Sequence, residues 1–472
     1  MDRTSEEKNP ESKTSTFCLR STKSIKGLYL LSREVLGSIL PKKLKECKQN
    51  DPKAYWNILN TCNKPKKEND ISLSSFKQHF ETLNQVDVEH SGEDFNPEDL
   101  FDGSNEELNK DFTLEELKKV IKKLKNGKAC GFDNLINEYL KNSPDYLLNA
   151  IVKLFNIILQ TGIVPEDWCI GIIIPLYKNK GSVNEVKNYR GINLLSILGK
   201  LFTSAIDLRV GAFFKSATAA SETPVGLGQE QVGFRHGYGP MYHAFTLHSI
   251  IDLFLQNHKR LFAGFVDYST AFDKIDRSTL WRKLLHTGIK GRIMRVVYNI
   301  YSRAKSCIKK GQKLSDFFSS NVGVRQGENL SPLLFAIYIN DFENHMKESY
   351  SGVSLINSEI ARVVGFEVLD LYLKLFVLLY ADDTIILAET AEELQLALTS
   401  LKDYCHQNFL KVNLTKTKVL IFSRGKLKNI PDFFYGDEKV EVVDDYVYLG
   451  VVFNYNGSFT KAIEKQVSQA KK

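Results

Sequence analysis

The stretch that decides the fold consists of two apolar runs separated by two acidic residues. It reads Leu375-Phe376-Val377-Leu378-Leu379-Tyr380-Ala381-Asp382-Asp383-Thr384-Ile385-Ile386-Leu387. Two β-rich runs around a short polar turn predict a β-hairpin that carries the paired aspartates at its tip. A second apolar run, Leu261-Phe262-Ala263-Gly264-Phe265-Val266, also ends in a carboxylate, that of Asp267.

Paired carboxylates beside apolar strands need a partner that neutralises them, because they repel each other and are costly to desolvate. A divalent metal is the usual partner, and the oxygen ligands of Asp suit Mg²⁺. Two such ions can stabilise both the attacking and the leaving oxygen of an in-line phosphoryl displacement. An isolated Asp-Asp pair is more often a surface turn, so the rest of the chain must decide between the two interpretations.

The composition excludes a fully disordered, collagenous or transmembrane chain. The sequence has 472 residues, 43% of them apolar and 25% charged, and its length favours about three domains. Its seven cysteines are scattered, with no Cys-x-x-Cys pair. This pattern argues against a disulfide framework or a zinc finger and favours a reducing compartment.

The positive charge matters through its placement rather than its total. With 63 basic and 56 acidic residues the net charge is only +7, which permits a polyanionic partner but does not require one. The tightest basic cluster comprises Lys118, Lys119, Lys122, Lys123, Lys125 and Lys128. On a helix the first four form one stripe, which is either a solvated face or a phosphate-facing surface.

The chain falls into four segments. We expect a polar and basic N-terminal extension at 1–50, partly disordered, and a helical lead-in with an acidic linker at 51–110. A capping box, Thr113 to Glu116, opens a helix predicted at Leu114–Lys125, with Gly127 as its stop. Alternating apolar strands and helices continue to about 455, and 456–472 resembles the start of a helix that the chain end cuts.

Ordered sequence blocks then resemble those of reverse transcriptases from non-LTR (LINE-type, jockey-like) retrotransposons. The Tyr380-Ala381-Asp382-Asp383 hairpin is the most specific of them. The others, in chain order, are Asn126-Gly127-Lys128-Ala129-Cys130-Gly131-Phe132-Asp133, Trp168 through Ile174-Pro175-Leu176-Tyr177-Lys178 to Asn188-Tyr189-Arg190-Gly191-Ile192-Asn193-Leu194-Leu195-Ser196, Gly233-Phe234-Arg235, Asp267-Tyr268-Ser269-Thr270-Ala271-Phe272-Asp273, Gly323-Val324-Arg325-Gln326-Gly327-Glu328-Asn329-Leu330-Ser331-Pro332-Leu333-Leu334-Phe335, Asn413-Leu414-Thr415-Lys416-Thr417 and Tyr448-Leu449-Gly450.

The resemblance implies an α+β right-hand polymerase fold. Helical and β fingers would occupy 111–260, an antiparallel-sheet palm 261–455 and a truncated thumb 456–472. It also implies an RNA-directed DNA polymerase that extends a primer 3′-OH on an RNA template with dNTPs and two Mg²⁺ ions, or Mn²⁺, in the cytoplasm or nucleus and away from membranes. The short N-terminal part and the missing thumb suggest a truncated copy of an element.

The resemblance also assigns roles residue by residue. Asp267, Asp382 and Asp383 match the metal-binding carboxylates, and Lys416 matches a proton donor to the pyrophosphate, for which Lys418 competes. The residues that match the nucleotide site are Lys178, Arg190, Phe272, Gln326 and Gly327. Those that match the hairpin holding the primer end are Tyr448, Leu449 and Gly450. We interpret Asp273 as structural, and on spacing alone Phe272 is either a sugar-contacting residue or a core residue.

Two departures from the family pattern leave alternatives open. Glu328 adds a carboxylate where relatives have a small or apolar residue, and it could weaken nucleotide binding or point away. Gly191 replaces a more common proline, which we expect to be tolerable. A catalytically silent RNA-binding remnant is the first alternative function, and a group II intron-type polymerase with a maturase role is the second. Phe272 argues for deoxynucleotides and against a viral RNA-dependent RNA polymerase.

Overall fold

The computed structural model describes residues 69–85, 103, 105–220, 239–354, 374–380 and 382–470. The chain divides into two compact units, Met1–Asn69 and Asp70–Lys472, and the elements below belong to the second. Our predictions for 1–68 and for Gly233-Phe234-Arg235 lie outside the described residues. No helix among the described residues combines the length and the apolar character needed to cross a membrane.

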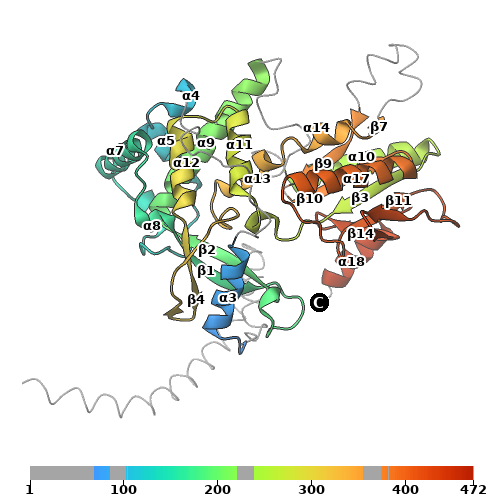
Figure 1. Cartoon of the computed structure of the whole chain (residues 1–472), viewed down its shortest axis with the longest axis horizontal. Coiled ribbons are helices and arrows are strands. Elements are labelled where there is room, and N and C mark those ends of the chain that lie inside the picture. The colour runs from blue at the N-terminus through green and yellow to red at the C-terminus, as the bar shows by residue number, and fades with distance from the viewer. Residues whose placement is uncertain are drawn as a thin grey trace, which may run out of the picture. The chain divides into compact units, whose positions relative to one another are not determined.

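A six-stranded sheet carries both acidic segments (Figure 1). Its strands, in spatial order, are β12 (Phe433–Tyr435), β13 (Glu438–Val442), β11 (Lys418–Phe422), β3 (Leu261–Val266), β10 (Asp383–Ala388) and β9 (Val377–Tyr380). β3 runs antiparallel to both of its neighbours, β10 and β11. β9 and β10 pair antiparallel with Asp383 opposite Tyr380, so the hairpin predicted from the sequence is confirmed.

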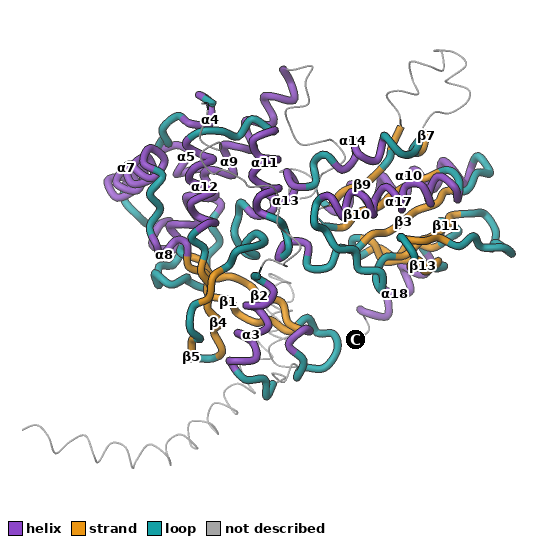
Figure 2. Tube along the Cα trace, viewed as in Figure 1, coloured by secondary structure: helices purple, strands orange, loops and turns teal. Residues whose placement is uncertain are grey.

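Every residue of β3 is buried, because a helix covers each face of the sheet. Phe262 and Val266 share one apolar cluster with Leu394 of α17 (Ala391–Gln407). Phe265 belongs to a different cluster, with Ile251 of α10 (Pro240–Gln256). Side chains of a strand alternate between faces, so this short run contacts both helices, which lie against the strands in Figure 2.

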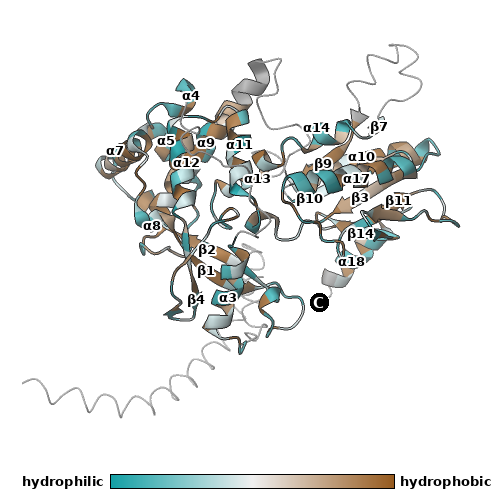
Figure 3. Cartoon of the chain, in the orientation of Figure 1, coloured by the Kyte–Doolittle hydropathy of each residue, from teal (hydrophilic) through white to brown (hydrophobic). Residues whose placement is uncertain are grey.

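A second sheet forms around β1 (Ile170–Tyr177). β1 pairs antiparallel with β2 (Tyr189–Leu195) and parallel with β4 (Lys305–Lys310). The short strands β5 (Lys313–Leu314) and β6 (Phe318–Ser319) each pair antiparallel with β4. Helix α3 (Leu73–Leu83) covers this sheet through Phe76 and Phe80. The strands β1 and β2 are largely hydrophobic (Figure 3).

Packing against α3 explains one departure from the family pattern. A Cβ atom added to Gly191 would lie 2.8 Å from Cε1 of Phe80 and 2.9 Å from Cγ2 of Ile173. Carbon atoms do not approach that closely without displacement, so this position has no room for a side chain. Glycine at position 191 therefore allows the Phe80 ring to pack directly on the backbone of β2.

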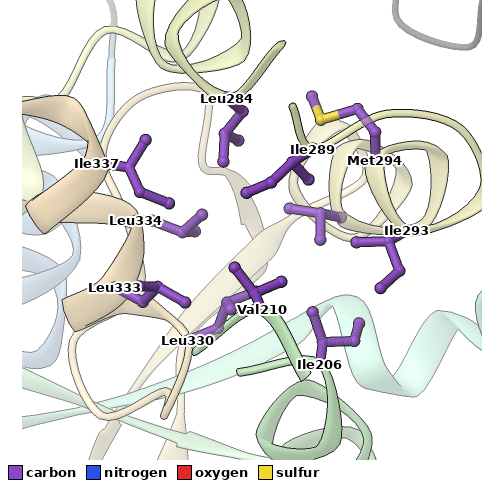
Figure 4. Close-up of a pocket in the computed structure, with 11 residues that line it drawn as sticks. Ile206, Val210, Leu284, Ile289, Ile293, Met294, Leu330, Leu333, Leu334 and Ile337 are labelled. Atoms are coloured by element: carbon purple, nitrogen blue, oxygen red, sulfur yellow. The ribbon is translucent and has the colours of Figure 1, made fainter. Parts of the chain in front are cut away.

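Helices make up most of the remaining core. They are α4 (Glu106–Asn109), α5 (Leu114–Lys123), α6 (Asn137–Lys141), α7 (Asp145–Thr161), α8 (Glu166–Cys169), α9 (Ile197–Ala220), α11 (Arg277–His286), α12 (Arg292–Ser302), α13 (Ser331–Tyr338) and α14 (Phe342–Lys347). A small pocket lies where α9, α11, α12 and α13 meet, and only apolar side chains line it (Figure 4). It contains no group that could recognise a nucleotide, so it is a feature of core packing.

The capping box of α5 is confirmed, but the helix ends earlier than predicted. The Thr113 side chain accepts a hydrogen bond from the Glu116 N–H, and Glu116 accepts one from the Thr113 N–H. The helix stops at Lys123 rather than Lys125. The following segment is drawn away to α6, since the Lys125 carbonyl accepts a hydrogen bond from Asn137.

The chain closes with a hairpin and a helix. β14 (Asp445–Tyr448) pairs antiparallel with β15 (Val451–Asn454), and α18 (Thr460–Ala470) follows. A two-stranded sheet of β7 (Val353–Ser354) and β8 (Lys374–Leu375) completes the described strands. The fold is thus of mixed α+β class, as the sequence predicted.

Candidate active site

The two acidic segments meet at one edge of the six-stranded sheet. Thr384 of β10 lies opposite Val266 of β3. Because the strands are antiparallel, the next positions beyond this pair are Asp383 and Asp267. Asp382 precedes Asp383 in the turn of the hairpin. The structure therefore brings together three carboxylates that the sequence separates by more than a hundred residues.

These carboxylates influence one another electrostatically. Burial, and then the charge of Asp267, raise the pKa of Asp382. Burial, followed by the charges of Asp382 and Asp267, raises the pKa of Asp383 to about 6. Asp383 keeps contact with solvent at the hairpin tip, so the shift marks partial desolvation together with repulsion. The site thus favours a cation.

Lys416 supplies a cation at this edge in the structure. Its Nζ donates to Oδ1 and Oδ2 of Asp267 at 3.1 and 2.9 Å. The 413–417 loop is held in place by the Asp267 backbone, which donates to Thr417 Oγ1 and accepts from the Asn413 N–H. Lys418 instead pairs with Glu441. Of the two lysines that competed in the sequence, Lys416 is the one that faces the carboxylates.

The donor set fits a hard divalent cation in its chemistry. The three side chains offer only carboxylate oxygens, and the Asp267 side chain is 25% exposed, so an ion can reach it. Among the described residues, however, no group of three acidic, His or Cys side chains has the geometry of a ready-made ion site. Lys416 contacts both oxygens of Asp267, so it competes with an ion for this carboxylate.

Lys178 and Arg190 lie near this edge, at the end of the β1–β2 hairpin. Arg190 is exposed opposite Leu176, and Lys178 directly follows β1. Desolvation lowers the pKa of Lys178, and the charges of Arg190 and Lys416 lower it further, whereas Asp273 opposes the shift. The predicted phosphate-binding cations and Lys416 therefore share one electrostatic neighbourhood.

The Gln326-Gly327 turn is anchored on β2 and on Asp273. The Gln326 carbonyl accepts a hydrogen bond from the Asn193 N–H at 2.9 Å, and Gln326 Nε2 donates to both carboxylate oxygens of Asp273. Gly327 adopts a φ of +104°, a region open mainly to glycine, and a Cβ atom added there would lie 3.0 Å from the Asn193 carbonyl oxygen. The turn thus runs directly beside β2, the strand that carries Arg190.

Phe272 lies in the 3₁₀ turn η3 (Ala271–Asp273), shortly after Asp267. Its ring stacks on Phe335 with the ring centroids 4.7 Å apart and an interplanar angle of 17°. The side chain is half-buried and packs against the main apolar cluster. One face of the ring is thus fixed by the core, which is compatible with a second face directed to a substrate.

The hairpin of Tyr448, Leu449 and Gly450 also reaches the acidic edge. Leu449 and Gly450 have φ values of +47° and +84°, the pattern of a tight two-residue hairpin turn. Burial and the nearby charge of Asp383 raise the pKa of Tyr448. Tyr446 of the same strand stacks on Phe265, one strand position away from Val266, with ring centroids 4.4 Å apart.

His243 is a neighbour of the site that sequence reasoning missed. Its buried ring on α10 hydrogen-bonds through Nδ1 to the Tyr448 hydroxyl at 3.3 Å and contacts the Tyr380 ring edge-on. Burial lowers the pKa of His243 to about 4, so the ring is neutral near pH 7. A histidine on an apolar helix carries no sequence signal for this contact with two tyrosines far along the chain.

Glu328 points away from the acidic edge. It is 5% exposed and accepts a hydrogen bond from the Tyr301 hydroxyl at 2.7 Å. The Tyr301 ring lies between the guanidinium groups of Arg277 and Arg325, whose donors bond several backbone carbonyls. The extra carboxylate therefore belongs to a buried charged network, and the alternative that it points away from the nucleotide site is supported.

The lysine stripe of α5 lies on the surface. Lys118, Lys119, Lys122 and Lys123 are exposed, while Leu117 and Ile121 of the same helix are buried. Lys118 pairs with Asp145 at 2.8 Å. The structure thus agrees with the predicted amphipathic pattern and leaves both interpretations of the stripe open.

Comparisons with known proteins identify relatives of this chain. The chain is 25% identical over 360 residues to the RNA-directed DNA polymerase from mobile element jockey of Drosophila funebris, over 74% of this chain and 36% of that protein. It is 26% identical over 324 residues to the probable RNA-directed DNA polymerase from transposon BS of Drosophila melanogaster, over 65% of this chain and 32% of that protein. Apo telomerase from Candida tropicalis, truncated from its C-terminal domain, matches with a TM-score of 0.40 and 14% identity, over 62% of this chain and 54% of that one.

The chain spans about a third of the length of these curated relatives. A family model described as reverse transcriptase (RNA-dependent DNA polymerase) matches residues 177–453, more than half of the sequence. That range holds all three carboxylates, the β9–β10 hairpin and the Gln326-Gly327 turn. The chain belongs to the reverse transcriptase (RNA-dependent DNA polymerase) family.

Proposed function

We propose that this chain is an RNA-directed DNA polymerase of a non-LTR retrotransposon, which extends a primer 3′-OH on an RNA template. One observation carries the proposal, namely that Asp267 lies beside the Asp382-Asp383 hairpin at the end of two paired strands. These carboxylates repel one another, and a bound cation would relieve that repulsion.

In this proposal Asp267 and Asp382 are the principal ligands of divalent metal, with Asp383 in support and Mg²⁺ as the expected ion. When bound, two such ions would stabilise the attacking and leaving oxygens of nucleotidyl transfer. Lys416 balances the charge of Asp267 without metal. Its ammonium, beside Asp267, is the group that would give a proton to the leaving pyrophosphate.

Five residues form the proposed nucleotide site. Arg190 offers a planar fork and Lys178 a point charge for the triphosphate. Gln326 and Gly327 bring an amide and an open backbone beside the incoming nucleotide. The Phe272 ring would lie against the sugar, where a 2′-hydroxyl would collide with it.

The primer end would rest on the Tyr448-Leu449-Gly450 hairpin. The contact between Tyr446 and Phe265 supports this placement, because it fixes the hairpin next to the strand that ends at Asp267. The Tyr448 hydroxyl is occupied by His243, so the backbone of the turn, rather than this hydroxyl, would contact the primer.

The sequence predicts fingers at 111–260 and a palm at 261–455, with a thumb beginning at 456. Residues 1–50 and 51–110 remain an extension and a lead-in. The packing of α10 on β3 supports moving that helix, Pro240–Gln256, from the fingers to the palm.

Extension of oligo(dT) on poly(rA) with dTTP tests this function. The wild-type chain should lengthen the primer with Mg²⁺ and not with EDTA, and Asp382→Asn should abolish extension while its melting temperature stays close to that of the wild type. A folded wild-type chain that binds the template–primer but never extends it would instead indicate the catalytically silent remnant.

A further inference from the structure

We propose that Asp273 is a positioning residue of the nucleotide site, which fixes the orientation of the Gln326 amide. The inference rests on the proposed function and deepens it. It gives a defined task to a carboxylate that is not among the three at the acidic edge.

The contact between Asp273 and Gln326 defines which way the amide points. Gln326 Nε2 lies 2.8 Å from Oδ1 and 2.9 Å from Oδ2 of Asp273. An ionised carboxylate only accepts hydrogen bonds, so the NH₂ end of the amide must face it. The Gln326 Oε1 atom is therefore left to accept a hydrogen bond from a bound molecule, and the amide cannot turn over without breaking two bonds.

The backbone holds Asp273 in register with Gln326. The Val324 N–H donates to the Phe272 carbonyl at 2.8 Å, and the Gly323 N–H donates to the Ile275 carbonyl at 2.9 Å. A Cβ atom at Gly323 would lie 2.5 Å from the Asp273 carbonyl oxygen. The turn that carries Phe272 and Asp273 thus packs on the segment that leads into Gln326. A displacement of that turn would therefore also move Gln326.

Asp273 lies within electrostatic reach of Lys178 and Arg190, the cations proposed to bind the triphosphate. Burial raises the pKa of Asp273 to about 6, while the hydrogen bond from Gln326 and the charges of Lys178 and Arg190 work against that rise. The carboxylate is hence mostly ionised near pH 7. In this form it accepts both hydrogen bonds of the Gln326 amide, which keeps the amide in one orientation.

Steady-state incorporation of dTTP on poly(rA)–oligo(dT) by the full chain tests the inference. Asp273→Asn keeps the shape but lets the amide pair form in either orientation, so the KM for dTTP should rise about tenfold, as expected for loss of charge-assisted hydrogen bonds. The kcat should change by less than about threefold. Asp273→Glu keeps the charge and displaces the carboxylate, so its KM should lie between the two.

A double-mutant cycle separates positioning from a general structural role. If Asp273 acts through Gln326, then Asp273→Asn in a Gln326→Ala background should raise KM little further. Asp276→Asn is the matched control, since Asp276 is a buried carboxylate three residues away that caps α11 through the Thr279 N–H at 2.7 Å. It should lower the melting temperature without a change in KM.

The outcomes are distinct. An inactive wild-type chain overturns the proposed function and this inference with it. An active wild type whose KM is unchanged in Asp273→Asn, or a cycle in which the two substitutions are additive, overturns this inference alone. If Asp273→Asn fails to fold, Asp273→Glu takes its place in the same cycle, and additivity there overturns the inference in the same way.

Discussion

At the scale of single residues, the acidic edge balances three carboxylates against one ammonium group. Asp267 accepts hydrogen bonds from Lys416 with both carboxylate oxygens. The pKa values of Asp382 and Asp383 are raised, because burial desolvates these carboxylates and neighbouring carboxylates repel them. Such a cluster is held by the strands around it and not by its own interactions. Two substitutions test how its neighbours contribute.

Phe272→Val should widen sugar selection while leaving the core intact. Because the ring stacks on Phe335, a smaller apolar residue can remain packed there. We expect dNTP incorporation within about an order of magnitude, roughly 1.4 kcal/mol of barrier, and a large gain in rNTP use. Single-nucleotide incorporation with dTTP and UTP measures both. Parallel loss of the two activities, or unfolding of the variant, would identify Phe272 as a core residue.

Lys416→Met should strengthen metal binding, because it removes a cation that competes for Asp267. An exposed ion pair is worth about 0.2–1 kcal/mol, so Mn²⁺ should bind up to about fivefold more tightly. Mn²⁺ titration followed by electron paramagnetic resonance measures this change. Lys418→Met is the control, since the Lys418 ammonium pairs with Glu441 instead. Unchanged or weaker Mn²⁺ binding in Lys416→Met would contradict the competition.

At the scale of elements, the site depends on hairpins docked against neighbouring strands and helices. The β9–β10 hairpin is fixed by β3, and the β14–β15 hairpin by the contact of Tyr446 with Phe265 and of Tyr448 with His243. The β1–β2 hairpin, which carries Arg190 and is followed at β1 by Lys178, packs against α3. Each predicted functional loop thus has a rigid element behind it.

Gly191→Ala tests the docking of α3 on the β1–β2 hairpin. The added methyl would overlap Phe80 and Ile173, so the free energy of unfolding should fall by about 1–3 kcal/mol. Phe80→Leu should recover part of this loss. Gly211→Ala is the control, because nothing lies within 4 Å of its added Cβ on helix α9, and it should stabilise by up to about 1 kcal/mol. Equal effects of both alanines in urea unfolding would contradict the steric account.

At the scale of the whole molecule, the placement of positive charge is expected to govern nucleic-acid binding. Replacing Lys118, Lys119, Lys122 and Lys123 with Gln should flatten the dependence of log Kd on log salt, by about 0.7–0.9 for each lost phosphate contact. Fluorescence anisotropy with a labelled template–primer measures the slope. Lys118→Gln alone should have the smallest effect, since Lys118 already pairs with Asp145. An unchanged slope in the fourfold variant would make the stripe a solvated face.

Local sequence patterns predicted the elements of the site, but not its long-range contacts. The two apolar runs around the turn at Asp382-Asp383 predict the hairpin, and Thr113 with Glu116 predicts the start of α5, because those signals lie within a few residues. The bond of Asp273 to Gln326, the contact of His243 with Tyr448 and the burial of Glu328 against Tyr301 join residues 27 to 205 positions apart. No local pattern encodes such pairs. The end of α5 was missed for the same reason, since Asn137 draws the chain away there.

The most direct test of the central claim is single-nucleotide addition on an RNA template by the wild-type chain and by Asp267→Asn. Asp267 lies in a different part of the sequence from the Asp382-Asp383 hairpin and meets it only in the fold. The account predicts Mg²⁺-dependent addition of one dTMP by the wild type. It also predicts a rate for Asp267→Asn lower by roughly 10³-fold or more, with an unchanged melting temperature. Addition by a folded Asp267→Asn variant at the wild-type rate would contradict it.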